Sequence, residues 1–176
     1  MADISFFHYL NSLAGQSSGF DFIVVLVGQY VPYVLGFLPF LLFRKQGWSK
    51  ETRSHVGFIY AYAIIARFVV TPIIRYFIIS PRPFLTPGVR QLIFNETSSS
   101  FPSGHAVFFF ALATGLWFYD RRLGLIAGIV ALLVSTARVI AGVHWPVDIV
   151  GGFVVGVGVT WICEVLRKRY LLGASL

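Results

Sequence analysis

Apolar segments long enough to cross a lipid bilayer recur along the chain, and no other feature limits its fold as strongly. Four of them run over residues 21–43, 54–79, 123–143 and 146–166, and a shorter one covers residues 104–119. A membrane-crossing helix needs about 20 predominantly apolar residues. Backbone polar groups inside the bilayer must find partners within the chain, which favours helices. The sequence therefore predicts an all-α integral membrane helical bundle with about five transmembrane helices.

Composition agrees with this fold class. Hydrophobic residues make up 57% of the chain and charged residues only 12%, which is far outside the averages for soluble proteins. The 176 residues are enough for a single domain, residues 1–176. The net charge of +7 does not indicate a nucleic-acid partner, because the lysines and arginines fall in short clusters between apolar segments, as topology signals do.

The N-terminal stretch, residues 2–17, is too short and too polar to span a membrane, and it predicts an interfacial amphipathic helix. Pro32 and Pro39 are expected to bend the first span, which neighbouring helices can tolerate. Small residues in the last span allow helices to approach closely. We expect this packing role for Gly151, Gly152, Gly156 and Gly158.

The distribution of lysine and arginine predicts the topology. Clusters at residues 44–53, 121–122 and 167–169 alternate with the other connections. Five spans then place the N-terminus outside and the C-terminus in the cytoplasm of a multi-pass protein of the inner (plasma) membrane. The 80–103 connection and the 138–146 corner should share the extracytoplasmic, or periplasmic, face.

Several arginines do not follow the positive-inside pattern. Arg75, Arg82, Arg90 and Arg138 fall on the outer face, so something other than topology must keep them there. Arg67 lies near the middle of the second span, where an internal partner, the floor of a polar cavity or direct contact with a phosphate would each explain a charge. The glycosylation sequon at residues 95–97 is a short pattern that often arises by chance.

Residues 138–148 combine an arginine, a histidine and a carboxylate at the edge of an apolar run. Pro146 suits the first turn of a helix, where its missing N–H is not needed. Asp148 then lies one helical turn from His144 and can accept a ring N–H, which leaves the other imidazole nitrogen to attack a substrate. The planar guanidinium of Arg138 suits a phosphate or a carboxylate.

Two further clusters complete the candidate site. Ser103 and Gly104 open a helix, whose free N–H groups favour an anion, and three arginines can surround that anion. Two histidines can supply a nucleophile and a proton donor, although the pattern alone does not decide which one attacks. The combination predicts phosphoryl transfer. The simpler alternative is that these charges only satisfy one another between helices, which does not explain why three clusters reach one face.

The three clusters read Arg75-x6-Arg82-Pro83, Phe101-Pro102-Ser103-Gly104-His105 and Arg138-x5-His144-x3-Asp148. In this order they strongly resemble the type 2 phosphatidic acid phosphatase superfamily of lipid phosphate phosphatases. Two positions depart from the family pattern. Arg75 stands where the family usually has lysine, which keeps the charge but changes its geometry. Ala137 stands where it usually has serine.

The resemblance implies a role for each matching residue. His144 would form a phosphohistidine while Asp148 orients it, and His105 would protonate the leaving group and then activate water. The phosphate would be bound by Arg75, Arg82, Ser103, Gly104 and Arg138. No metal and no other cofactor would be needed.

The resemblance also implies a lipid phosphate substrate, held at headgroup level among membrane lipids. The compact chain, its outward-facing site and the run from Pro81 to Phe84 look most like bacterial undecaprenyl diphosphatases. Phosphatidylglycerophosphate, lipid A phosphate and phosphatidic acid are the alternatives within the family. A non-catalytic lipid carrier or scaffold is an alternative of another class, and the complete set of histidine and aspartate positions argues against it.

Overall fold

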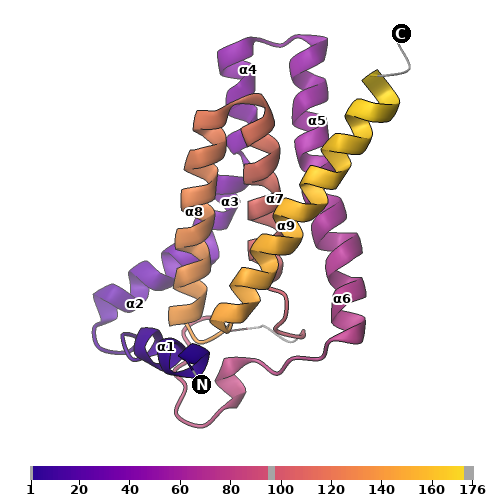
Figure 1. The fold of residues 1–176 in the computed structure, drawn as a ribbon. Helices are drawn as coiled ribbons and strands as arrows, with labels where there is room; N and C mark the ends of the chain where they lie inside the picture. The colour runs from indigo at the N-terminus through magenta and orange to yellow at the C-terminus, as the bar shows by residue number, and fades with distance from the viewer. Residues whose placement is uncertain (1, 95–97, 173–176) are drawn as a thin grey trace.

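A computed structural model describes residues 2–94 and 98–172, and this part of the chain forms helices and no strands (Figure 1). The all-α membrane bundle predicted from the sequence is thereby confirmed. The helical segments are α1 (Ala2–Asn11), α2 (Ser18–Val25), η1 (Leu26–Tyr30), α3 (Val31–Gly36), η2 (Leu38–Phe40), α4 (Leu41–Gln46), α5 (Lys50–Ile64), η3 (Ile65–Val70), α6 (Thr71–Phe77), η4 (Pro83–Leu85), α7 (Gly104–Tyr119), α8 (Arg121–Ile140), α9 (Pro146–Arg167) and η5 (Lys168–Leu172). The predicted sequon, residues 95–97, lies outside the described residues.

Four of the helical runs are long and apolar enough to cross a membrane, namely Ser18–Gln46, Lys50–Phe77, Arg121–Ile140 and Pro146–Tyr170. Helix α7 is shorter, with 16 residues, and would extend about 24 Å at 1.5 Å per residue. It contacts α5, α8 and α9, and most of its residues are buried. Because its neighbours cover it, α7 forms the centre of the bundle and carries part of the site at its first turn.

Prolines shape the first two runs. The predicted bends are present, since a widened π turn, η1, precedes Pro32 and the 3-10 turn η2 contains Pro39. A second π turn, η3, precedes Pro72 in the second run. Proline has no N–H for the usual i→i−4 hydrogen bond. In both π turns the residue just before the proline instead donates its N–H to the carbonyl five positions back.

Glycines in α9 let this helix pack against α7, as small residues do in membrane bundles. A Cβ placed on Gly152 would lie 2.5 Å from Cβ of Ala106, and one on Gly156 would lie 2.5 Å from the carbonyl oxygen of Val107. Gly151 likewise faces the ring of Phe101. The prediction for Gly158 was wrong, because a Cβ there would meet no atom within 4 Å.

The predicted basic clusters lie together at one end of the bundle. The connections at 47–49 and at residue 120 lie at this end, together with the end of α9, and the three predicted basic clusters lie on the helix ends there (Figure 1). Asp120 caps α8 by accepting the N–H of Leu123 at 2.9 Å, and it pairs with Lys45 from the neighbouring turn. The hydrogen bond from Lys45 lowers the pKa of the Asp120 carboxyl. The 78–103 connection and the 141–145 corner lie together at the opposite end.

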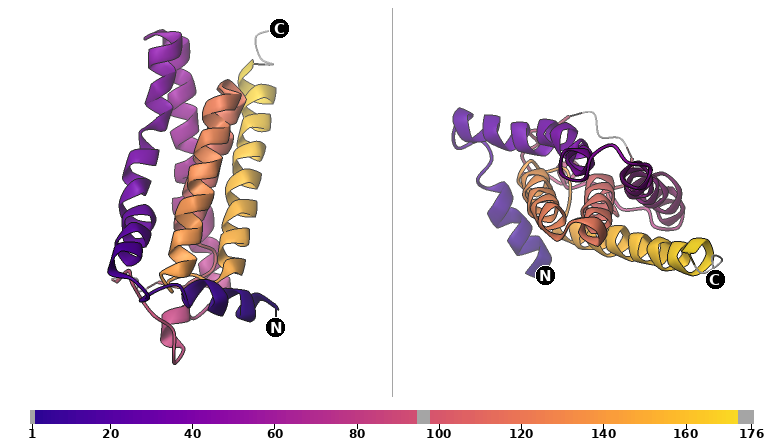
Figure 2. Two further views of the ribbon diagram at one scale, coloured as in Figure 1. Left: turned by 90° about the vertical axis from the view of Figure 1, so that its left-hand side faces the viewer. Right: turned by 90° about the horizontal axis from the view of Figure 1, so that it is seen from above.

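The N-terminal helix α1 lies across that opposite end, roughly perpendicular to the bundle (Figure 2). Its buried Asn11 side chain donates to the carbonyl oxygens of Arg90 and Ile140 at 2.8 and 2.9 Å. Arg90 in turn donates from Nη1 to the carbonyl oxygen of Ala14 at 2.6 Å. Arg90 therefore holds α1 against the bundle, which accounts for one of the arginines that departs from the positive-inside pattern.

Candidate active site

The three sequence clusters meet at the end of the bundle that α1 covers. They arrive from the end of α6 with the connection after it, from the start of α7, and from the corner between α8 and α9 (Figure 1). Hydrogen bonds join them directly. Arg82 donates from Nη1 to the carbonyl oxygen of Val143 at 3.0 Å, and the N–H of Ser103 donates to the carbonyl oxygen of Asp148 at 3.0 Å.

His144 and Asp148 form a buried pair, with Nδ1 of the histidine 3.3 Å from Oδ2 of the carboxylate. Only 1% of the His144 surface and none of the Asp148 surface is exposed. Ser100, also fully buried, donates its hydroxyl to the same Oδ2 atom and lies 3.4 Å from Nδ1 of His144. The backbone N–H of Trp145 is a further donor to Oδ2, at 2.8 Å. The hydrogen bonds from Ser100 and Trp145 thus hold the Asp148 carboxylate beside the imidazole ring of His144.

The local sequence explains why this pair forms. Gly142 has a φ of +74°, and the N–H groups of Gly142 and Val143 donate to the carbonyls of Val139 and Arg138. Such a left-handed glycine and this bonding pattern commonly end a helix. A side chain at Gly142 would also overlap the carbonyl of Arg90. Pro146 then opens α9 as its first residue, so His144 and Asp148 lie one turn apart.

Arg75 and Arg82 converge on one serine. The Oγ atom of Ser98 accepts from Nη1 of Arg75 at 2.9 Å and from Nη2 of Arg82 at 3.3 Å. Arg82 also donates from Nε to the carbonyl of Ser98, and Arg75 from Nη2 to that of Pro102, both at 2.8 Å. These bonds fix two guanidinium groups beside the loop that leads into α7.

Arg138 approaches from α8 and is the largest of the fully buried side chains, with 2% of its surface exposed. Its Nη1 atom donates to the carbonyl oxygen of Gly28 at 3.1 Å. Pro32 lies four residues after Gly28 and offers no N–H to this oxygen. The first membrane span therefore helps to position an arginine of the site.

The first turn of α7 carries Ser103, Gly104 and His105. Ser103 precedes the helix as its cap residue and is fully buried, and its Oγ atom has no hydrogen-bond partner among the described residues. His105 is half-buried and lines two cavities of about 490 and 420 Å³, which are otherwise largely apolar. His105 is close enough to interact electrostatically with Arg138, His144, Arg67 and Arg82. His105 thus stands between the charged cluster and apolar space.

Sequence reasoning missed two serines of the site, Ser98 and Ser100. Both lie in a polar connection with several serines, where no periodicity or spacing distinguishes them. It also left the role of Arg67 open. The structure places its guanidinium beside the start of α7, since a Cβ on Gly104 would lie 2.5 Å from Nε of Arg67.

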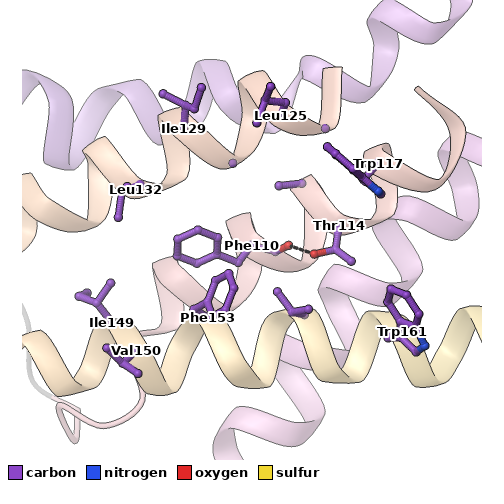
Figure 3. Close-up of a pocket in the computed structure, with 14 residues that line it drawn as sticks. Phe110, Thr114, Trp117, Leu125, Ile129, Leu132, Ile149, Val150, Phe153 and Trp161 are labelled. Carbon is purple, nitrogen blue, oxygen red and sulfur yellow. Dashed lines mark hydrogen bonds between the residues drawn. The ribbon is translucent and has the colours of Figure 1, made fainter. Parts of the chain in front are cut away.

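A larger apolar cavity, of about 600 Å³, lies between α7, α8 and α9 (Figure 3). The rings of Phe110 and Phe153 pack edge to face in its lining, and Trp117 and Trp161 lie toward one end. A large apolar pocket is often the first candidate for a binding site, provided that a few polar groups converge on it. None of the described residues that line this cavity has a titratable side chain. We therefore choose the charged cluster beside His105, and not this cavity, as the candidate active site.

Among the described residues no group of three or more histidine, cysteine, aspartate or glutamate side chains is placed to hold a metal ion. Positive charge in the site comes from Arg75, Arg82 and Arg138. Independence from metals stays a prediction.

Comparisons with known proteins identify a family model and several similar proteins. The family model of the PAP2 superfamily matches residues 56–170. Undecaprenyl-diphosphatase BcrC of Bacillus subtilis is 32% identical over 86% of this chain and 77% of its own length. The bacitracin transport permease protein BcrC of Bacillus licheniformis is 30% identical over 88% of this chain and 75% of its own. The crystal structure of Aquifex aeolicus LpxE matches with a TM-score of 0.75 and 26% identity, covering 94% of this chain and 96% of that one.

Proposed function

We propose that this chain, which belongs to the PAP2 superfamily of membrane lipid phosphatases, removes the terminal phosphate from undecaprenyl diphosphate. The observation that carries the mechanism is the buried contact between His144 and Asp148, and Arg82 bonds to the carbonyl of Val143 immediately before this histidine. A histidine oriented by a carboxylate is an activated nucleophile. The expected catalytic residues are His144, Asp148 and His105, and the expected phosphate ligands are Arg75, Arg82, Ser103, Gly104 and Arg138.

The first step is attack by His144 on the terminal phosphorus. The carboxylate of Asp148 accepts a hydrogen bond from the N–H at Nδ1 of His144, which leaves the lone pair of Nε2 for the phosphate. A bond forms between Nε2 and phosphorus, and the bond from phosphorus to the bridging oxygen breaks. The electron pair stays on that oxygen, which takes a proton from His105. The products of this step are a phosphohistidine and a lipid monophosphate.

The second step releases inorganic phosphate. Water attacks the phosphohistidine and gives a proton to His105, which restores His105 as an acid and frees His144. His105 suits both transfers, because it lies next to the charged cluster and also borders cavities that open away from it. One residue acting as acid and then as base follows from microscopic reversibility.

The arginines and the start of α7 stabilise the transferred phosphoryl group. Guanidinium groups bind phosphate oxygens through paired, charge-assisted hydrogen bonds, and the first N–H groups of α7 point toward an anion placed before them. The buried hydroxyl of Ser103 is a further donor at the same place. Such fixed donors act most strongly on charge that develops during reaction.

The substrate assignment rests on the site's place in the bundle and on the relatives. The charged cluster lies at one end, where a lipid phosphate at headgroup level can reach it. A relative named for undecaprenyl diphosphate supports that lipid over phosphatidylglycerophosphate, lipid A phosphate or phosphatidic acid. The basic clusters at the opposite end favour a cytoplasmic C-terminus and an extracytoplasmic site in the plasma membrane.

Phosphate release by the purified protein in detergent tests the proposal. Undecaprenyl diphosphate, phosphatidylglycerophosphate, lipid A and phosphatidic acid would be compared, with His144→Ala as the inactive control. We expect the highest kcat/KM on undecaprenyl diphosphate and no release by the variant. A higher kcat/KM on another lipid would reject undecaprenyl diphosphate as the preferred substrate. Binding without phosphate release from any lipid would instead support a carrier.

A further inference from the structure

Arg67 lies at the boundary between the charged cluster and the apolar cavities. It belongs to the π turn η3, within the second membrane run, and such widened turns are frequent at functional sites. Its guanidinium lies against the backbone of Gly104, the first residue of α7, and 5.2 Å from the ring centre of Phe68. A charge at this depth in a membrane helix is costly and is a candidate for function.

Arg67 and His105 share one cavity. This cavity of about 420 Å³ is lined by both side chains and by Gly104, and its remaining walls are aromatic or aliphatic. Arg67 also interacts electrostatically with His105. The two residues come from different helices, yet they face the same space, which lies on the apolar side of the arginine cluster.

The proposed reaction determines what must occupy this space. The acid, His105, has to contact the bridging oxygen, because that oxygen leaves with the electron pair. The terminal phosphate then lies on one side of His105, among Arg75, Arg82 and Arg138. The group on the other side of the bridging oxygen must extend toward the cavity with Arg67. In a lipid diphosphate, that group is the second phosphate.

We propose that Arg67 binds the lipid-side phosphate of a diphosphate substrate and thereby favours diphosphates over monophosphates. This inference rests on the proposed function. When the bridging bond breaks, negative charge grows on the departing lipid monophosphate, and the guanidinium stabilises it. A lipid monophosphate places only carbon at this point and gains no contact between a second phosphate and Arg67. The aromatic walls, Tyr60, Phe68 and Phe109, then receive the first part of the lipid chain.

Farnesyl diphosphate and farnesyl phosphate test the inference, because they share one chain and differ in one phosphate. For Arg67→Gln we expect kcat/KM to fall roughly 10- to 100-fold on the diphosphate, the size of a lost charged hydrogen bond. The value on the monophosphate should change less than about 3-fold. Arg67→Lys, which keeps the charge, should recover part of the loss on the diphosphate.

Two other variants are controls for the difference between the diphosphate and the monophosphate. Arg75→Gln removes a ligand of the transferred phosphoryl group and should reduce both activities equally. Arg53→Gln changes an exposed arginine at the far end of the same helical run and should alter neither. Inhibition supplies a second measurement, since Arg67→Gln should weaken inhibition by pyrophosphate more than inhibition by inorganic phosphate.

The possible outcomes distinguish the proposed role of Arg67 from the proposed function. Equal losses on both farnesyl substrates in Arg67→Gln, with wild-type activity on the diphosphate intact, would reject the second-phosphate subsite and leave the proposed function standing. Wild-type protein that hydrolyses neither farnesyl diphosphate nor undecaprenyl diphosphate would reject both. A misfolded Arg67→Gln would be recognised by its thermal stability in detergent, and Arg67→Lys with pyrophosphate inhibition would then decide the question.

Discussion

Arg138 donates a hydrogen bond of 3.1 Å from Nη1 to the carbonyl oxygen of Gly28, and so ties helix α8 to the first membrane span. A proline four residues after Gly28 keeps this oxygen from receiving an ordinary helical N–H. A bend in one helix therefore positions a proposed phosphate ligand on another.

Pro32→Ala should lower activity without lowering stability. The new N–H at position 32 would compete with Arg138 for the carbonyl of Gly28. We expect kcat/KM to fall about 2- to 10-fold, as for the loss of one positioning hydrogen bond. Thermal unfolding should occur at an equal or higher temperature. Pro39→Ala, which removes the other bend of this span, is the matched control, and an equal loss of activity there would contradict the link to Arg138.

Ser100→Ala should reduce kcat with little change in KM. The hydroxyl holds Oδ2 of Asp148 beside His144, so its removal affects the orientation of the nucleophile and leaves the phosphate ligands in place. We expect a loss of about 10-fold, measured by phosphate release. Ser99→Ala is the control, because Ser99 bonds to the backbone of Ser80 and Ile78. A change confined to KM would place Ser100 in substrate binding instead.

Replacing each of the two histidines should impair a different part of the reaction. His144→Ala should abolish turnover on every substrate. His105→Ala should cost more on a lipid monophosphate than on p-nitrophenyl phosphate, because p-nitrophenolate hardly needs a proton to leave. If water activation becomes limiting, this variant should give a burst of p-nitrophenol and retain acid-labile phosphate. A burst in His144→Ala and none in His105→Ala would reverse the two assignments.

Single cysteines should report the orientation of the bundle in intact cells. In a Cys163→Ala background, Thr86→Cys lies in the exposed connection beside the site and Gln46→Cys lies at the opposite end. An impermeant thiol reagent should label position 86 and not position 46, since basic clusters favour the cytoplasm. The reverse pattern would place the site in the cytoplasm.

Activity should survive a chelator. In the proposed mechanism the arginines supply positive charge to the phosphate and a side chain is the nucleophile, so neither role requires a metal ion. We expect unchanged phosphate release after treatment with EDTA. Loss of turnover that Mg²⁺ restores would show that a cation takes part in the reaction.

The amino-acid sequence alone predicts the helical bundle, its spans and the residue types of the candidate site. Apolar length predicts membrane helices because lipid leaves backbone groups no other partner. The contact between His144 and Asp148 was also predictable, since one helical turn separates them and Pro146 fixes where that turn begins. Local geometry is sufficient for each of these conclusions.

The distant residues that support that site become apparent only in the folded chain. Ser100 reaches Asp148 across 48 positions and Arg138 reaches Gly28 across 110. The place of Arg67 against Gly104 and the lack of any neighbour at Gly158 were likewise settled by helix packing. Such contacts depend on how whole helices rotate and approach one another. The spacing of residues along the sequence does not encode this arrangement. Lipid-facing and buried faces of a membrane helix are both apolar, so only packing determines which residues meet.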